Sequence, residues 1–323
     1  MKWTGIIISF TAGGAICFAI LFFTGHDDSK RAMEERPAVQ SVTFSPDVPA
    51  SVTFCGETVD LTRYNRHEGM DRELSSFTYL HSTTMLLLKR ANRYFPVIEP
   101  ILKANGIPDD FKYLAVIESN LDPTAVSPAR ARGMWQFMES TAKEYRLVIT
   151  PTVDERYSVS RATEAACRYL SDAYERYGDW LLVAASYNAG MRRISTEYER
   201  QNASSALDMW LVEETSRYLY RIFAIKQIFE NPYRYGFVMN ARNLYKVIPC
   251  TEVTVSADIP DLVEFAARYG LALSDLKRFN PWLRDTRLAV DKRTFVILIP
   301  DSSKLTYGQN SVEVHDPRWV INR

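Results

Sequence analysis

From residue 70 to residue 235, apolar side chains recur at spacings of three and four, which is the repeat of one face of an α-helix. The stretch 160–177 shows this most clearly, because its alanines, tyrosines and leucine share one face and Gly178 follows as a stop signal. Asp179 is a good N-cap for the apolar stretch after it. This pattern predicts a mainly α fold built around one large helical domain.

The helical pattern stops after residue 235, and a different order of elements follows. We expect a strand, two short helices and a strand, which together form a small α+β module with the order β-α-α-β; they lie at 253–255, 261–269, 274–279 and 295–299. The tail beyond Pro300 is expected to be loose. The predicted segments are a membrane anchor or signal segment at 1–25, a spacer and lead-in with some β-like residues at 26–69, the helical domain at 70–240, the module at 250–300 and a tail at 301–323.

The N-terminus carries an uncharged apolar run from Trp3 to Phe23. About 20 such residues can cross a bilayer, whereas the apolar part of a cleaved signal peptide has roughly 7–15 residues. We therefore favour an uncleaved membrane anchor through residues 3–23, with a cleaved signal peptide as the alternative. Either one takes the chain out of the cytoplasm, so the predicted location is the cell envelope, on the periplasmic side.

Composition and motifs argue against several classes of function. The 39 basic and 39 acidic residues balance, so no basic field suggests a nucleic-acid partner. The four histidines form no pair at metal-ligand spacing, the four cysteines form no C-x-x-C pair, and no glycine-rich phosphate loop is present. We therefore expect no metal and no cofactor. A disulfide between Cys55 and Cys250 stays open, because an oxidising compartment would allow it.

One acidic residue lies in an apolar helical stripe. Phe111, Leu114 and Ala115 occupy one face of a predicted helix at positions i, i+3 and i+4, and Glu118 takes the i+7 place on that face. A buried carboxylate that stays charged and unpaired costs several kcal/mol. It must therefore either pair with a cation, such as an arginine across the core, or have a raised pKa. A raised pKa is what a general acid needs near neutral pH.

Two further segments combine apolar and polar residues in a way that suits a cleft. The segment Gly133-Met-Trp-Gln-Phe-Met138 places a tryptophan, a neutral amide and a methionine after a glycine at which another backbone can approach closely. The segment Ala184-Ala-Ser-Tyr-Asn-Ala-Gly190 ends an apolar helix with a tyrosine and an asparagine. Taken singly, each is equally well an aromatic core patch or a helix C-cap.

Taken together, these segments resemble the catalytic domain of family 1 lytic transglycosylases, which share the goose-lysozyme-like helical fold. The resemblance covers about residues 70–235, and the tryptophan before Gln136 is similar to the membrane-bound murein transglycosylase D branch. The residues that carry it occur in family order: Glu118-Ser119, Gly133-x-x-Gln136, Ala185-x-Tyr187-Asn188-Ala189-Gly190 and Glu214-Thr-x-x-Tyr218. The module at 250–300 resembles a degenerate LysM glycan-binding module that lacks the usual opening Gly-Asp-Thr.

The resemblance implies a peptidoglycan lytic transglycosylase with Glu118 as its single catalytic acid and then base. Such an enzyme cleaves the bond between N-acetylmuramic acid and N-acetylglucosamine without water and leaves a 1,6-anhydro ring. One carboxylate can suffice, because the attacking hydroxyl belongs to the substrate and is held at high effective concentration. The implied partner is the glycan strand, and the implied substrate-binding residues are Ser119, Gln136, Met138, Tyr187, Asn188, Glu214 and Tyr218.

Two alternatives to this function stay open at the level of sequence. A hydrolytic muramidase on the same fold would need a second carboxylate to position water. A catalytically inactive peptidoglycan-binding protein would have no use for a costly buried acid, and the presence of Glu118 and of Tyr187-Asn188 argues against it.

Overall fold

The structure is a computed structural model that describes residues 44–308 and 312–321. The predicted anchor or signal segment at 1–25 lies outside the described residues. Within the described ranges, no helix is both long enough and apolar enough to cross a membrane. The fold is mainly α, as the sequence predicts, with two small antiparallel sheets of two strands each in this part of the chain.

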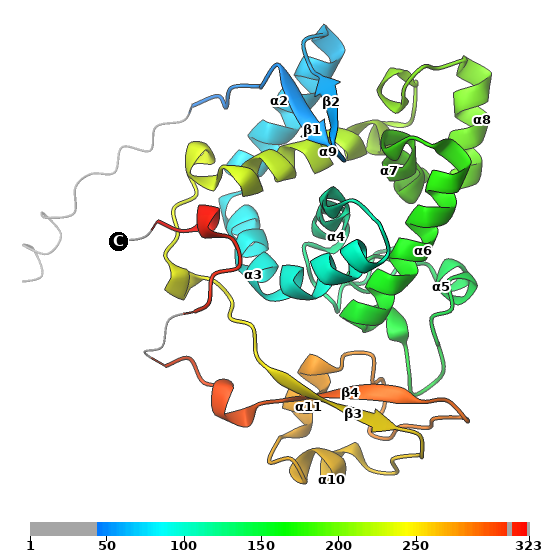
Figure 1. Cartoon of the computed structure of the whole chain (residues 1–323), viewed down its shortest axis with the longest axis vertical. Coiled ribbons are helices and arrows are strands. Elements are labelled where there is room, and N and C mark those ends of the chain that lie inside the picture. The colour runs from blue at the N-terminus through cyan, green and yellow to red at the C-terminus, as the bar shows by residue number, and fades with distance from the viewer. Residues whose placement is uncertain (1–43, 309–311, 322–323) are drawn as a thin grey trace, which may run out of the picture. The chain divides into compact units, whose positions relative to one another are not determined.

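The helical domain begins with a hairpin and continues as a series of helices (Figure 1). Its strands and helices are β1 (Ser51–Phe54), β2 (Glu57–Asp60), α2 (Tyr64–Tyr79), α3 (His81–Ala104), α4 (Lys112–Ser119), α5 (Glu139–Glu144), α6 (Val159–Tyr177), α7 (Trp180–Ala189), α8 (Met191–Gln201) and α9 (Glu213–Glu230). Short 3-10 helices lie at Asp109–Phe111, Glu155–Tyr157, Ala206–Asp208, Pro232–Tyr235 and Ala241–Asn243.

The boundary between α6 and α7 follows from the residues at their ends. The hydroxyl of Ser158 caps the start of α6, and Gly178 ends it in the left-handed conformation with φ of +61°. The carboxylate of Asp179 then accepts the backbone N–H groups of Leu181 and Leu182, which have no partner inside α7. The predicted stop at Gly178 and the predicted cap at Asp179 are therefore both confirmed.

Helix α4 lies in the interior of the helical domain, between α3 and α9 (Figure 1). Every residue from Lys112 to Ile117 is buried, and so is Ser119. Glu118 alone among the residues of α4 keeps partial exposure. The helix is therefore covered on all sides apart from this partial exposure of Glu118, so the apolar stripe that pointed to Glu118 does not distinguish one face of α4 from another.

The hairpin of β1 and β2 packs onto α9 (Figure 1). Its turn consists of Cys55 and Gly56, both with positive φ, as a tight two-residue hairpin requires. Phe54 is buried between Phe111 and Phe223, with ring centroids 5.7 and 5.6 Å away. The disulfide that the sequence left open is not formed: Cys55 lies in this turn, Cys250 begins β3 of the C-terminal module, and both thiols are free.

The C-terminal module has the predicted order of elements. These are β3 (Cys250–Val255), α10 (Leu262–Ala267), α11 (Leu273–Phe279) and β4 (Phe295–Pro300). The strands pair antiparallel, from Cys250 opposite Pro300 to Val255 opposite Phe295. Asn280, fully buried after α11, ties the helices to the sheet: its side chain exchanges hydrogen bonds with the backbone of Leu298 at 2.7 and 2.8 Å.

A loop of the helical domain joins the module through backbone hydrogen bonds. The N–H of Asp154 donates to the carbonyl of Trp282 at 2.9 Å, and the N–H of Arg284 donates to the carbonyl of Thr152 at 2.9 Å. Val153, between these two pairs, is fully buried in the apolar core of the module. The module therefore completes its core with a residue from the helical domain.

The prediction of a loose tail is wrong for residues 312–321, which lie against the helical domain. Trp319 is buried, its indole N–H donates to the carbonyl of Phe229 at 3.0 Å, and its ring packs against Phe95 and Phe229. The side chain of the buried Asn92 accepts the N–H of His315 at 2.8 Å. Burial of a large aromatic side chain supplies enough free energy to fix the backbone around it.

Candidate active site

Glu118 stands at the last turn of α4, where the helix stops because Asn120 and Leu121 adopt positive φ angles of 54° and 53°. One oxygen of its carboxylate, Oε1, accepts a hydrogen bond from the hydroxyl of Tyr218 at 2.6 Å. Burial raises the pKa of Glu118 to about 7, against the opposing effects of this hydrogen bond and of Arg221. No salt bridge joins Glu118 to a cation within the described residues, so the raised pKa, rather than an ion pair, answers the question that the sequence left open.

Tyr218 is buried on α9 and reaches Glu118 from a helix 100 residues further along the chain. Burial and the nearby charge of Glu118 raise the pKa of Tyr218 well above its usual value. Its hydroxyl therefore keeps its proton and acts as a donor to the carboxylate. This contact holds Oε1, and it leaves the other oxygen of Glu118 without a hydrogen bond from any described residue.

Tyr187 approaches the same carboxylate from α7. Its hydroxyl donates to the backbone carbonyl of Trp135 at 2.8 Å. Burial raises the pKa of Tyr187 well above its usual value, and the charge of Glu118 contributes to that shift. Trp135 itself is fully buried, and its indole N–H is held by Thr163 at 2.9 Å. Fixed contacts therefore link Tyr187 of α7 to the loop at 133–138 and to α6.

The loop at 133–138 can take this course only with glycine at its start. Gly133 has φ of +79°, and a Cβ there would lie 1.7 Å from the carbonyl oxygen of Arg156. Gln136 has φ of +50°, and its amide nitrogen donates to the carbonyl of Gly133 at 2.8 Å. The side-chain amide is thereby oriented, while its oxygen has no hydrogen bond within the described part of the chain.

Asn188 follows Tyr187 on α7 and is oriented from α9. The hydroxyl of Thr215, which is buried, donates to the side-chain oxygen of Asn188 at 2.9 Å. The amide nitrogen of Asn188 remains as a donor for a ligand. Thr215 was not among the predicted site residues, although it stands between Glu214 and Tyr218 in the motif that suggested them.

Three of the predicted substrate-binding residues, Ser119, Met138 and Glu214, form no hydrogen bond with the site residues described above. The hydroxyl of Ser119 donates back to the carbonyl of Ala115 in its own helix at 3.1 Å. Met138 is 44% exposed and precedes α5, and no hydrogen bond joins it to the residues above. Glu214 is exposed in the first turn of α9, and its charge raises the pKa of Glu118 as the smallest of the contributions there.

Arg221 acts on the candidate site and is not among the residues that the sequence motifs identified. It lies on α9 three residues after Tyr218, which is about one helical turn. Its guanidinium lies 5.9 Å from the ring centre of Phe77, and its charge lowers the pKa of Glu118. The signal available in sequence was the i+3 spacing from Tyr218, which places both side chains on one side of α9.

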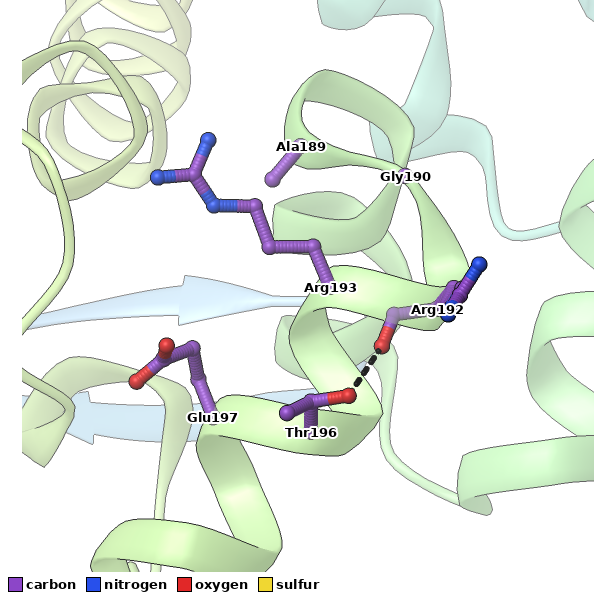
Figure 2. Close-up of a pocket in the computed structure, with 6 residues that line it drawn as sticks. All are labelled: Ala189, Gly190, Arg192, Arg193, Thr196 and Glu197. Atoms are coloured by element: carbon purple, nitrogen blue, oxygen red, sulfur yellow. Dashed lines mark hydrogen bonds between the residues drawn. The ribbon is translucent and has the colours of Figure 1, made fainter.

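A cavity of about 340 Å³ begins directly after Asn188. Its lining consists of Ala189, Gly190, Arg192, Arg193, Thr196 and Glu197. Figure 2 shows Arg193 extending past Ala189, whereas Arg192 points to the other side of α8. The cavity therefore lies at the junction of α7 and α8, next to Asn188 in sequence.

Two family models match parts of the chain. Residues 96–209 match the transglycosylase SLT domain family, and residues 251–303 match the C-terminal LysM-like domain of soluble lytic transglycosylases. The SLT match ends before α9, which supplies Tyr218, Thr215 and Arg221.

Several named proteins are similar to the chain. Membrane-bound lytic murein transglycosylase D of Escherichia coli strain K12 is 28% identical over 236 residues, which are 72% of this chain and 51% of that protein. Membrane-bound lytic murein transglycosylase F of Klebsiella pneumoniae is 28% identical over 127 residues, which are 36% of this chain and 23% of that protein. The solved structure of the soluble lytic transglycosylase SLT70 of Escherichia coli has a TM-score of 0.39 and 18% identity, and the match covers 52% of this chain and 31% of that one.

The chain spans about half the length of the transglycosylase D relative. Its two family matches occur in the order in which the helical domain and the β-α-α-β module follow each other. The chain thus contains a transglycosylase SLT domain followed by a LysM-like domain, and it is homologous to membrane-bound lytic murein transglycosylase D.

Proposed function

We propose that the protein is a peptidoglycan lytic transglycosylase that uses Glu118 first as acid and then as base. The observation that carries this proposal is the buried carboxyl of Glu118, whose pKa is raised to about 7 and which has a neutral hydroxyl rather than a cation as its direct partner. Near neutral pH such a group is partly protonated and can give or take a proton with little driving force in either direction.

The proposed reaction needs no second catalytic carboxylate. Protonated Glu118 gives its proton to the glycosidic oxygen as the bond from that oxygen to C1 of the muramic acid breaks. The C6 hydroxyl of the same sugar then attacks C1, and its proton passes to the Glu118 carboxylate. The acid is thereby restored, one C–O bond replaces another, and no water is consumed. Tyr218 keeps the carboxylate oriented through both steps by its hydrogen bond to Oε1.

The neutral polar groups around Glu118 fit the task of holding an uncharged sugar. Gln136 offers a side-chain oxygen and Asn188 a side-chain nitrogen, and each amide is fixed by a hydrogen bond on its other end. N-acetyl groups have one donor and one acceptor, so such a pair of amides can fix their orientation. Ser119, Met138, Tyr187 and Glu214 complete the proposed substrate-binding set as residues beside these groups.

Two acidic residues of the helical domain, Asp122 and Glu73, are engaged by cations, whereas Glu214 is exposed and forms no salt bridge among the described residues, so product mass decides between this reaction and hydrolysis. Asp122, the acidic residue nearest to Glu118 in sequence, accepts two hydrogen bonds from Thr124, at 2.7 and 2.8 Å, and pairs with Arg90 at 3.3 Å. Glu73, which is buried, pairs with Arg217 at 2.7 Å. Both carboxylates are held by other partners, whereas an inverting or retaining hydrolase needs a second carboxylate directed at water or at the sugar.

We further propose that residues 3–23 carry the chain to the cell envelope and hold it at a membrane, with the SLT domain on the periplasmic side. The apolar run in the sequence supports this proposal, and the relatives whose names call them membrane-bound are consistent with it. Intact-mass measurement of the protein from membrane fractions distinguishes an anchor from a cleaved signal segment.

The proposed activity is tested by digesting purified peptidoglycan with the full chain and analysing the products by mass spectrometry. A transglycosylase yields products lighter by one water than those of hydrolysis, and a Glu118→Gln variant yields none. Products of full hydrolysed mass would replace the proposal with a muramidase. If neither form released products while both bound peptidoglycan, the protein would be a binding protein.

A further inference from the structure

Trp210 is the most exposed large apolar side chain in the described part of the protein, with 86% of its surface accessible. Tryptophan is among the largest apolar side chains, and exposure of most of its area to water is unfavourable. Its neighbour Met209 is buried, and Leu211 packs against the core of the helical domain. The chain is therefore anchored on both sides of Trp210 while the indole points outward.

The backbone of Trp210 is held by one side chain. Gln201, the last residue of α8, accepts the N–H of Trp210 at 2.6 Å and donates to its carbonyl at 3.0 Å. The same Gln201 amide donates to the carboxylate of Glu197 at 2.7 Å. An exposed side chain on a backbone fixed in this way is presented in a defined position, so little conformational entropy is lost when a ligand covers it.

This position lies on the same part of the domain as the candidate active site. Glu197, to which Gln201 binds, lines the cavity that begins after Asn188 (Figure 2). Thr215, which orients Asn188, follows Trp210 by five residues, so their Cα atoms are at most about 18 Å apart. A ligand chain that enters the site past Asn188 can therefore reach the indole within a few sugar rings.

We propose that Trp210 is a stacking platform for a sugar ring of the glycan strand, away from the bond that is cleaved. This inference rests on the proposed function and adds a subsite to it. Pyranose rings have apolar faces of C–H groups and polar edges, and an indole offers a flat apolar face with a polar N–H at its edge. The geometry assigns Trp210 to binding of long strands, since it lies beyond the groups that hold the reacting sugars.

The charges around Trp210 favour a glycan over a membrane surface. The basic residues that reach this segment, Arg63 and Arg66 at the start of α2, are paired with Asp208 at 3.4 and 2.9 Å. A membrane-docking face combines several exposed apolar residues with basic ones. Between residues 198 and 215, only Val212 joins Trp210 among the exposed large apolar side chains. Glu213 and Glu214, both exposed, follow directly and would be repelled by anionic lipids.

The test measures binding in the full chain with Glu118→Gln as the background, so that strands are bound without being cut. The ligands are long glycan strands freed of peptide and, separately, short fragments of two disaccharide units, which contain one bond from N-acetylmuramic acid to N-acetylglucosamine. Trp210→Ala is expected to weaken binding of long strands about fivefold to tenfold and to leave the short fragments unaffected, whereas Trp210→Phe loses about twofold because it keeps an aromatic face. Tyr233→Ala is the matched control, since Tyr233 is 71% exposed at the other end of α9.

The same substitution in the active protein should raise KM for long strands and leave kcat on short fragments unchanged. Equal affinity of Trp210→Ala and its parent for long strands would overturn the inference, and so would a loss of binding to vesicles of phosphatidylethanolamine and phosphatidylglycerol with no loss of glycan binding. Failure of the proposed function gives a different result, because the protein with Glu118 intact would then release no anhydro products from any substrate.

Discussion

Each of the two regions of the molecule buries a polar side chain, but the two side chains differ in how completely their hydrogen-bonding groups are paired. In the LysM-like domain, Asn280 is fully buried, its nitrogen donates to the carbonyls of Leu276 and Leu298, and its oxygen accepts the N–H of Leu298. In the SLT domain, Glu118 has a single neutral donor, Tyr218, and a pKa raised to about 7. A saturated polar group stabilises the fold, whereas an incompletely paired acid stores free energy that catalysis can use.

The two regions also differ in how far each holds itself together. The helical domain has a large core that spans α2 to α9, whereas the small core of the LysM-like domain includes two residues of the helical domain, Val153 and Tyr157. Small domains bury a smaller fraction of their surface on folding and are correspondingly marginal in stability. The difference indicates that the LysM-like domain is fixed relative to the loop at 148–157 rather than joined to the SLT domain by a free linker.

The largest expected effect comes from removing the acid. Glu118→Gln keeps the shape of the side chain and an acceptor for Tyr218 but cannot transfer a proton, so the rate of release of anhydro products should fall by about 10²–10⁴. Glu175→Gln, on the exposed side of α6, is a matched control that should keep the full rate. A Glu118→Gln variant with more than a tenth of the parent rate would assign the acid to another residue.

The corresponding change in the LysM-like domain should affect stability instead. Asn280→Ala removes three hydrogen bonds and leaves both the N–H and the carbonyl of Leu298 without their partner, while the carbonyl of Leu276 keeps the backbone N–H of residue 280. Unsatisfied buried groups cost about 1–3 kcal/mol each, so the free energy of unfolding should fall by at least about 2 kcal/mol. Urea unfolding measures this loss. An unchanged midpoint would mean that Asn280 does not stabilise the fold, so it would not differ from Glu118 in this respect.

Glu118→Gln should act on stability in the opposite direction. The pKa of Glu118 in the folded protein, about 7, lies above its ordinary value of 4.5, so between these values the folded state binds more protons and stability falls as pH rises. Below pH 4.5 the carboxyl is neutral in both states and costs nothing. Above pH 7 the variant should therefore be more stable than the parent by up to about 3 kcal/mol, since one pKa unit corresponds to about 1.4 kcal/mol.

The measurement is the difference in Tm between the two proteins at pH 4 and at pH 8. A gain at pH 8 that vanishes at pH 4 confirms that the acid is held at the expense of stability. An equal difference at both pH values would mean that the substitution acts through packing rather than through the charge of Glu118.

Many helix ends and the order of elements could be predicted from the sequence, because these features depend on local residues. The stop at Gly178, the cap at Asp179 and the order of strands and helices in the LysM-like domain each depend on neighbouring residues. Residues that meet from distant segments were harder to predict. Trp319 was assigned to a loose tail because the groove that buries it is formed by Phe95 and Phe229, which lie far from it in sequence.

In the candidate site, too, the residues of local motifs could be predicted, whereas their contacts with distant segments could not. Glu118 and Tyr218 were identified through their motifs, but the motifs do not reveal that Ser119 donates to its own helix or that Thr215 orients Asn188. Both depend on rotamers that the surrounding packing selects. The sequence also could not predict that α4 is buried on all sides. The spacing of apolar residues identifies one face of a helix and gives no information on what covers the other faces.

The smallest expected effect concerns the charges that adjust the pKa of Glu118. Arg221 lowers this pKa and Glu214 raises it, so Arg221→Met should raise the pKa and Glu214→Gln should lower it. Activity that needs protonated Glu118 declines as pH rises through its pKa. The alkaline limb of the profile of kcat/KM against pH should therefore move to higher pH in Arg221→Met and to lower pH in Glu214→Gln. Opposite shifts in the two variants cannot arise from a general loss of packing, which would lower the whole profile without moving its limb. Shifts of the same sign would mean that Arg221 and Glu214 act on the substrate rather than on Glu118.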